Sequence, residues 1–130
     1  MSVAMIPSPK SILIIDDDIN QRRSLALVLK SVNYMVNTVG KAGEAIENLK
    51  AEKYDLIILD IATIDTKINL LPTVKGLYPE VPILVFTAQW SPETAAEIEQ
   101  IGISAHLSKP ITPSALLDCV DLILREQKLN

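Results

Sequence analysis

The sequence predicts a single α/β domain in which a doubly wound sheet of five parallel strands lies between two layers of helices, a three-layer sandwich. The first observation is that short apolar runs alternate with segments of helical periodicity along the whole chain. The second is size, because 130 residues, 48% of them hydrophobic, suit one domain with a sizeable core. Since crossovers between parallel strands are right-handed, the winding direction should reverse beside the first strand, where a crevice opens.

The first strand–helix unit begins with an unbroken apolar run, Ile12-Leu13-Ile14-Ile15, which ends in Asp16-Asp17-Asp18. Such a run is typical of a strand buried in a parallel sheet. Asp18 is predicted to cap the helix that follows. The apolar face of that helix has the spacing i, i+3, i+4, i+7 and consists of Leu25, Val28, Leu29 and Val32.

The second unit is less apolar than the first. Its strand is expected at 34–39, nearer a sheet edge because the segment is partly polar. The apolar face of its helix consists of Ala42, Ala45, Ile46 and Leu49. The third unit combines a buried strand over 56–59, which ends in Asp60, with a short helix ended by Gly76. The apolar positions of that short helix are Leu70, Leu71 and Val74.

The last two units have clear helix-start signals. The fourth strand, 83–86, ends in Thr87, and Ser91-Pro92-Glu93 then supplies an N-cap, a first-turn proline and an acid at the positive end of the helix dipole. Gly102 should end this helix. A short strand at 105–107 precedes Lys109-Pro110, and Thr112-Pro113 repeats the cap signal. The apolar positions of the last helix are Leu116, Leu117, Val120, Ile123 and Leu124.

Charge and cysteine content exclude several classes of protein. The formal net charge is −4 with no basic run, which argues against direct nucleic-acid binding. The apolar runs are too short to span a membrane, and the start of the chain has no secretory pattern. The single cysteine, Cys119, excludes an internal disulfide, suits a packed position and fits a cytoplasmic location. We expect residues 1–10 to form a flexible lead-in, 11–126 the domain, and 127–130 a tail.

Polar side chains follow four strand ends, namely Asp16-Asp17, Asp60, Thr87 and Lys109. Because the carboxyl ends of parallel strands meet at one edge of the sheet, these groups should converge there. Clustered carboxylates repel one another, and hard oxygen ligands of this kind suit Mg²⁺. A lysine and a hydroxyl nearby would stabilise phosphoryl oxygens, and a carboxylate could become an aspartyl phosphate.

In order and spacing these motifs resemble the receiver domain of bacterial response regulators, which act in two-component, phosphorelay signal transduction. The resemblance rests on Ile-Ile-Asp-Asp-Asp at 14–18, Leu-Ile-Ile-Leu-Asp at 56–60, Phe-Thr-Ala at 86–88 and Ser-Lys-Pro at 108–110. It covers residues 11–124 and implies a CheY-like, flavodoxin-like (βα)5 fold with strand order 2-1-3-4-5. It also implies a regulatory phosphoprotein that is not an enzyme, apart from self-phosphorylation by a donor and slow autodephosphorylation.

The resemblance implies a metal site and a phosphoacceptor. Asp60 would take a phosphoryl group from a phosphohistidine on a sensor histidine kinase or phosphotransfer protein. Asp17, Asp60 and the backbone carbonyl of Ala62 would bind Mg²⁺ directly. Asp16 would act mainly through a metal-bound water, and Lys109 would pair with Asp60 at rest.

The resemblance also implies a switch. Thr87 would turn inward to bind a phosphoryl oxygen and move the loop that follows it, and Lys109-Pro110 matches a position where a cis peptide is usual. The family's switch aromatic falls at His106, where an imidazole can fill the pocket but is polar. An output protein or a second copy of the chain would bind through the fourth helix, fifth strand and fifth helix.

The chain departs from the family pattern beside the acceptor. The stretch 61–68 lacks the proline and the glycine that commonly follow the acceptor, so the loop and the start of the third helix should be re-shaped. Ala62 and Gln89 occupy positions that tune attack by water, and only Gln89 could orient a water through its side chain.

Two alternatives remain open. A small Mg²⁺-dependent phosphohydrolase of the haloacid dehalogenase type would use Asp16, Asp18, Thr87 and Lys109. That family also needs a later acidic pair on another strand end, whereas the acids after Lys109 fall within one helical pattern. A receiver-like interaction module that is not phosphorylated is the second alternative.

Overall fold

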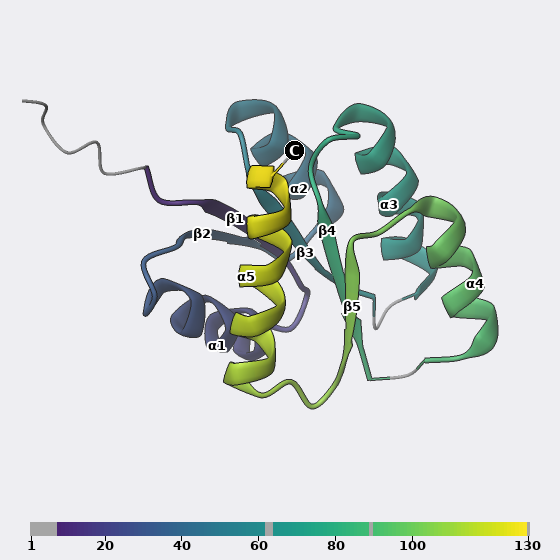
Figure 1. Ribbon diagram of the computed structural model, residues 1–130. Coiled ribbons are helices and arrows are strands. Elements are labelled where there is room, and N and C mark those ends of the chain that lie inside the picture. Colours follow the sequence, from purple (N-terminus) through teal and green to yellow (C-terminus); the bar gives the residue numbers. More distant parts are fainter. Residues whose placement is uncertain (1–7, 62–63, 89, 130) are drawn as a thin grey trace, which may run out of the picture.

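Figure 1 shows the computed structural model, which describes residues 8–61, 64–88 and 90–129. In this part of the chain, five strands alternate with five helices. The strands are β1 (Ser11–Ile15), β2 (Met35–Val39), β3 (Leu56–Asp60), β4 (Ile83–Thr87) and β5 (Ala105–Ser108). The helices are α1 (Ile19–Lys30), α2 (Ala42–Ala51), α3 (Ile64–Leu77), α4 (Pro92–Ile101) and α5 (Pro113–Leu129).

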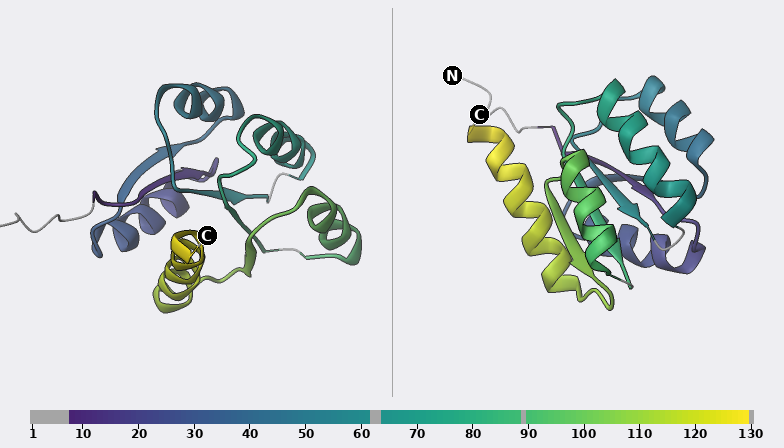
Figure 2. Two further views of the ribbon diagram at one scale, coloured as in Figure 1. Left: turned by 45° about the horizontal axis from the view of Figure 1, so that its top comes forward. Right: turned by 90° about the vertical axis from the view of Figure 1, so that its right-hand side faces the viewer.

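The strands form one parallel sheet in the order β2-β1-β3-β4-β5, which confirms the predicted fold class and strand order. Helices α1 and α5 cover one face, and α2, α3 and α4 cover the other, as the views in Figure 2 show. The direction of winding reverses beside β1, because the chain passes from β2 across β1 to β3. The carboxyl ends of β1 and β3 therefore lie side by side at this switch point.

The position of β1 inside the sheet, between β2 and β3, explains why Ile12-Leu13-Ile14-Ile15 is an unbroken apolar run. Ile12 and Ile14 pack into the core under α1 and α5, whereas Leu13 and Ile15 pack into the core under α2, α3 and α4. All four side chains are buried. Each buried aliphatic side chain contributes about 1.5–3 kcal/mol, so both layers anchor the strand that leads to the aspartates.

Strand β2 lies at the edge of the sheet, as its polar residues predicted. Met35 is 59% exposed, whereas Val39, at the end of the strand, is buried against the core. The edge strand therefore contributes little burial except at its carboxyl end.

Most predicted helix boundaries are confirmed. Asp18 caps α1 by accepting hydrogen bonds from the backbone N–H groups of Asn20 and Gln21. Ser91 caps α4, and Gly102 ends α4 with a left-handed φ of 87°. One prediction for α1 is wrong: Val32 is 44% exposed because the helix ends at Lys30 and the chain turns away from the core.

Helix α3 is longer than the short helix predicted from its apolar positions. It spans 14 residues and continues one residue past Gly76, to Leu77. Pro72 lies inside it, and an interior proline costs about 3 kcal/mol relative to alanine. The burial of Leu71 and Val74 against the core offsets this cost.

Helix α5 begins as predicted, because the Thr112 hydroxyl accepts a hydrogen bond from the Ala115 N–H at 3.1 Å. It continues to Leu129 and so includes residues 127–129 of the expected tail. Within the described residues, no helix is both long and apolar enough to cross a membrane.

Candidate functional site

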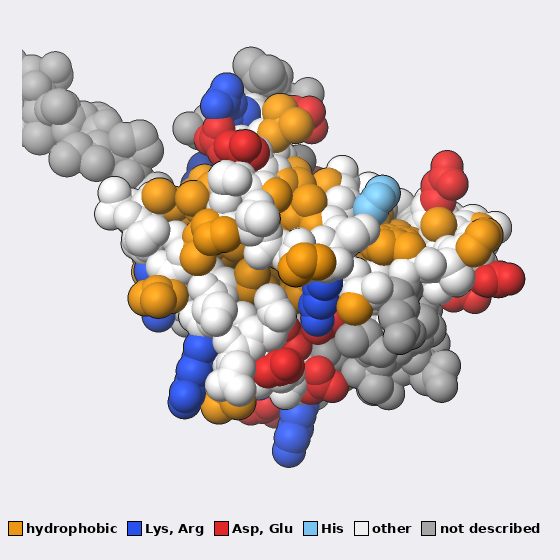
Figure 3. All heavy atoms as spheres, turned by 90° about the horizontal axis from the view of Figure 1, so that it is seen from below, with side chains coloured by type: hydrophobic (Ala, Val, Ile, Leu, Met, Phe, Trp, Pro, Cys, Tyr) orange, Lys and Arg blue, Asp and Glu red, His pale blue; other side chains and the backbone are white. Residues whose placement is uncertain are grey.

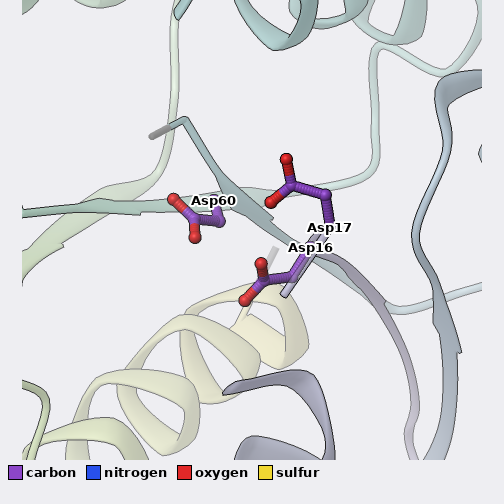
Figure 4. Close-up of side chains that lie close together, drawn as sticks. All are labelled: Asp16, Asp17 and Asp60. Atoms are coloured by element: carbon purple, nitrogen blue, oxygen red, sulfur yellow. The ribbon is translucent and has the colours of Figure 1, made fainter. Parts of the chain in front are cut away.

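The structure brings the predicted carboxylates together at the carboxyl edge of the sheet. Figure 3 looks onto this edge, and acidic side chains gather near its centre. Asp16 and Asp17 directly follow β1, and Asp60 ends the neighbouring strand β3. One carboxylate oxygen from each lies within 4.8 Å of the others, and Figure 4 shows the three side chains around one space. Three residues that were predicted to converge therefore share one site.

Backbone hydrogen bonds fix these positions beyond the ends of the strands. The Asp16 N–H donates to the Val39 carbonyl at 3.0 Å, and the Ile61 N–H donates to the Phe86 carbonyl at 3.0 Å. The hydrogen-bond ladder of the sheet thus continues one residue past the ends of β1 and β3. The acidic side chains are held by the sheet itself and not by a free loop.

Burial separates Asp16 from the other two residues of the aspartate triplet. Asp16 is fully buried and its Oδ1 accepts the Asp18 N–H at 2.9 Å, whereas Asp17 and Asp18 are exposed. Asp60 is 1% exposed. Like charges at about 4 Å repel by about 1 kcal/mol in water and about 4 kcal/mol at an effective dielectric constant of 20. A cation bound among these carboxylates would therefore stabilise the cluster.

Lys109 supplies one positive charge. Its Nζ donates to Asp60 Oδ2 at 2.8 Å, and the lysine side chain is 20% exposed. The Nζ also lies 5.2 Å from the centre of the Phe86 ring. The Lys109 N–H donates to the Thr87 carbonyl at 3.0 Å, so the end of β4 positions the lysine. The Lys109-Pro110 peptide bond is cis, as expected.

Thr87 is the last residue of β4 and is 1% exposed. Its backbone carbonyl accepts a hydrogen bond from the Lys109 N–H, and the Lys109 Nζ donates to Asp60. Three of the predicted site residues are therefore connected by hydrogen bonds. Two other predicted positions, the Ala62 carbonyl and the Gln89 side chain, lie outside the described residues.

The donor chemistry of the acidic cluster fits Mg²⁺. Its three carboxylates offer hard oxygen ligands, two from buried residues and one from an exposed residue. An exposed side leaves room for the waters that Mg²⁺ retains and for phosphate oxygens. The described residues near the carboxylates supply no thiolate or imidazole ligand to the cluster, which argues for a hard cation.

Arg22 is a contact that the sequence did not reveal. Its Nη1 donates to the backbone carbonyl of Asp16 at 3.0 Å. A Cβ atom on Gly40 would lie 2.9 Å from this Nη1, so the missing side chain of Gly40 makes room for the guanidinium. The sequence did not predict this contact, because no local pattern links a helical arginine to a strand end.

Trp90 and His106 form a second group beside the acidic cluster. Their ring centres are 4.6 Å apart and the rings are tilted by 58°. His106 is exposed, whereas Trp90 is half-buried against the core. The Trp90 Nε1 atom is buried without a hydrogen-bond partner among the described residues. The position expected to hold a switch aromatic therefore packs against a tryptophan that follows β4.

Cys119 occupies the packed position that the sequence predicted. It is half-buried against the core under α1 and α5, and burial raises the pKa of its thiol. A pocket of about 440 Å³ includes Lys10, Tyr54 and Tyr78 and none of the predicted site residues. The described residues that are predicted to act in the site therefore lie at the carboxyl edge of the sheet and not at this pocket.

A profile of the response regulator receiver domain matches residues 12–121. The transcriptional regulatory protein GlrR of Escherichia coli (strain K12) is 30% identical over 123 residues, which are 94% of this chain and 28% of that protein. The transcriptional regulatory protein ZraR of the same strain is 33% identical over 101 residues, which are 77% of this chain and 23% of that protein. The chain thus spans about a quarter of the length of these curated relatives.

Solved structures of receiver domains are also similar to this chain. A CheY-like response regulator receiver domain protein from Methanospirillum hungatei JF-1 has a TM-score of 0.88 at 30% identity and covers 93% of this chain and 98% of its own. The chemotaxis protein CheY4 of Vibrio cholerae has a TM-score of 0.83 at 28% identity and covers 88% of this chain and 98% of its own.

Proposed function

The chain belongs to the response regulator receiver family, and we propose that it is a phosphorylation switch whose acceptor is Asp60. Receiver domains are regulatory parts of two-component systems and not classical enzymes. Membership in this family also removes the haloacid dehalogenase alternative. The acids that alternative would need after Lys109 lie on α5 and not at a strand end.

The observation that supports the acceptor role most directly is the ion pair between Lys109 and Asp60. It holds a buried carboxylate beside Asp16 and Asp17. Such a carboxylate is a nucleophile that a cation can stabilise before and after reaction. Asp17 is exposed and Asp18 is a helix cap, so neither offers a comparable environment.

Phosphoryl transfer to Asp60 is a displacement at phosphorus. A carboxylate oxygen attacks the phosphoryl group of a phosphohistidine, the P–N bond breaks, and its electron pair stays on the imidazole nitrogen, which takes up a proton. The attacking carboxylate has no proton to lose, so this chain needs no basic side chain. The positively charged Lys109 ammonium group would pair with the phosphoryl oxygens. The Thr87 hydroxyl would donate a hydrogen bond to one of them.

Receiver domains bind Mg²⁺ at an acidic pocket of this kind. In this chain Asp17 and Asp60 would hold the ion, together with the Ala62 carbonyl, and Asp16 would act through a bound water. Bound Mg²⁺ would neutralise the clustered acids and the charge that develops on the transferred group. We expect slow autodephosphorylation as the only other reaction at this site.

Phosphorylation would act by changing charge. An aspartyl phosphate adds up to about two negative charges and three acceptor oxygens. We expect this to shift an existing equilibrium of the Thr87 loop and of the surface formed by α4, β5 and α5. A sensor histidine kinase or phosphotransfer protein would supply the phosphoryl group in the cytoplasm, and an output protein would bind the α4–β5–α5 surface.

Intact mass spectrometry tests this proposal. The protein is incubated with a small phosphodonor such as acetyl phosphate, with Mg²⁺ or with EDTA. We expect a gain of one phosphoryl group that requires Mg²⁺ and is lost in Asp60→Ala. No gain would favour the interaction module that is not phosphorylated, and a gain that persists in Asp60→Ala would show that the acceptor lies elsewhere.

A further inference from the structure

The pocket of about 440 Å³ lies at the amino edge of the sheet, opposite the edge shown in Figure 3. The segments that lead into β1, β3 and β4 contribute Lys10, Asp55 and Pro82 to its lining. Its volume falls within the range of small-molecule sites, about 300–1,000 Å³. The phosphorylation switch uses none of its residues, so a ligand bound here would be separate from the acceptor.

The walls of the pocket are largely apolar and held in place by the fold. Leu124 of α5 is buried, and Tyr54 and Tyr78 present aromatic rings. The Tyr54 hydroxyl accepts a hydrogen bond from the Asn37 amide at 2.7 Å and donates to Asn48 at 3.3 Å, which fixes the ring. An apolar or aromatic group of a ligand would therefore meet a preformed surface.

Three of the charged residues around the pocket already have partners within the chain. Lys10 lies 4.0 Å from a carboxylate oxygen of Asp55, and the other oxygen of Asp55 accepts the Ser11 N–H at 2.7 Å. Glu52 accepts a hydrogen bond from the Asn37 amide at 3.1 Å. These side chains hold the fold at the amino edge, so they contribute less to ligand selection.

Two opposite charges remain at the rim. Lys53 and Glu80 line the pocket and are exposed, and neither forms an ion pair with another described residue. Lys53 lies between α2 and β3, and Glu80 lies between α3 and β4, which are the segments before two neighbouring strands. A ligand that bridges them needs an anionic group, a cationic group and an apolar body. Such complementarity favours a zwitterion over a ligand with one charge.

We propose that this pocket binds a small amphipathic zwitterion, such as an amino acid with an aromatic side chain. The ligand's carboxylate pairs with Lys53, its ammonium group pairs with Glu80, and its apolar body packs against Tyr54 and Tyr78. No covalent step is involved. The ligand joins the segments before β3 and β4, so it stabilises the folded chain by mass action whatever the state of Asp60.

The test is a titration of the full chain, followed by the backbone amide signals in NMR spectra. Four probes differ in one feature each. L-Phenylalanine carries the ring and both charges, 2-phenylethylamine lacks the carboxylate, 3-phenylpropionate lacks the ammonium group, and glycine lacks the ring. The amide signals of Tyr54, Tyr78 and Glu80 report on the pocket, and that of Asp60 reports on the acidic cluster.

We expect phenylalanine to shift the pocket signals and to leave the Asp60 signal unchanged. It should bind about three- to fivefold more tightly than either analogue with one charge, because each analogue lacks one partly exposed ion pair. Glycine should give no shift. Equal binding of phenylalanine and either analogue overturns the choice of a zwitterion. Pocket signals that do not move with any probe overturn the site.

Matched variants assign the two charges. Lys53→Gln should remove the preference for phenylalanine over 2-phenylethylamine, and Glu80→Gln should remove its preference over 3-phenylpropionate. Lys50→Gln and Glu47→Gln make the same charge changes at exposed positions of α2 outside the pocket and should retain both preferences. Equal losses in the rim variants and in these controls overturn the assignment.

A pocket-filling variant and a mass measurement complete the test. Val81→Phe places a larger side chain in the pocket and should abolish phenylalanine binding, and its amide spectrum shows whether the fold is retained. Retained binding in a folded Val81→Phe overturns the pocket. The phosphoryl gain of Asp60 is measured separately by mass. A normal gain without phenylalanine binding contradicts only the pocket, and binding without phosphoryl gain contradicts only the acceptor.

Discussion

Lys109 Nζ lies 2.8 Å from Oδ2 of Asp60, which joins two residues 49 positions apart in the sequence. The pair connects the end of β3 with the residue that follows β5, across β4 between them. Asp60 also lies close to Asp16 and Asp17, so Lys109 contacts a cluster of three carboxylates. The site is therefore arranged to attract a further cation and to stabilise anionic phosphoryl oxygens.

Loss of the lysine should destabilise the protein when no metal is present. In EDTA, Lys109→Ala should lower the free energy of unfolding by about 1–3 kcal/mol, because it leaves the buried Asp60 carboxylate without its charged donor. Urea denaturation measures this. The same change in an Asp60→Asn background should cost clearly less. Lys10→Ala removes an exposed contact of 4.0 Å to Asp55 and should have almost no effect. Similar losses in both lysine variants would contradict the assigned pairing.

The neighbours Asp17 and Asp18 should respond in opposite ways to the same substitution. Asp17→Asn removes a charge from the cluster, so it should raise the free energy of unfolding by about 1 kcal/mol in EDTA and abolish the stabilisation by Mg²⁺. Asp18→Asn keeps a good N-cap and should leave both quantities nearly unchanged. Thermal unfolding with and without Mg²⁺ measures both variants. Retention of Mg²⁺ stabilisation in Asp17→Asn would refute Asp17 as a ligand.

Two glycines provide a test of the Arg22 contact. Gly40→Ala places a Cβ 2.9 Å from Arg22 Nη1 and should displace its bond to the Asp16 carbonyl. We expect a loss of about 1 kcal/mol in unfolding free energy and weaker Mg²⁺ binding. Gly43→Ala lies in α2 with no atom within 4 Å and should stabilise the protein by about 0.5 kcal/mol. Unchanged Mg²⁺ affinity in Gly40→Ala would show that Arg22 does not position Asp16.

Cys119 should react slowly with alkylating reagents. Burial raises the pKa of its thiol, so less of the reactive thiolate is present near pH 8 than in an exposed cysteine. Because the raised pKa favours the protonated thiol in the folded state, this contribution to stability is present below the pKa of the unfolded thiol and is lost as the pH rises past it. Iodoacetamide labelling should be severalfold slower for the folded protein than in urea. Equal rates would contradict the packed position.

The position of the acidic cluster was predictable because the carboxyl ends of parallel strands lie at one edge of the sheet. Strands β1, β3 and β4 are buried on both faces, so each is an apolar run with a visible end, and its first polar residue marks the site. The chemistry of those polar residues then suggested a cation and a phosphoryl group. Caps such as Asp18 were predictable for the same reason, since they depend on neighbours within one turn.

Contacts between distant elements could not be predicted. The bond from Arg22 to the Asp16 carbonyl depends on the position of α1 over the sheet, and the contact between Trp90 and His106 depends on how the chain leaves β4. Helix α3 is longer than predicted and contains Pro72, although a proline normally argues against a helix interior. Tertiary packing outweighs local preference in each case.

Peptide mapping after borohydride treatment tests the central claim most directly. Borohydride reduces an aspartyl phosphate to homoserine, so it marks the acceptor residue itself. The protein is treated with acetyl phosphate and Mg²⁺, reduced, digested and sequenced by mass spectrometry. The account predicts homoserine at position 60, and none there when Mg²⁺ is replaced by EDTA. Homoserine at position 16 or 17, or at no position, would contradict it.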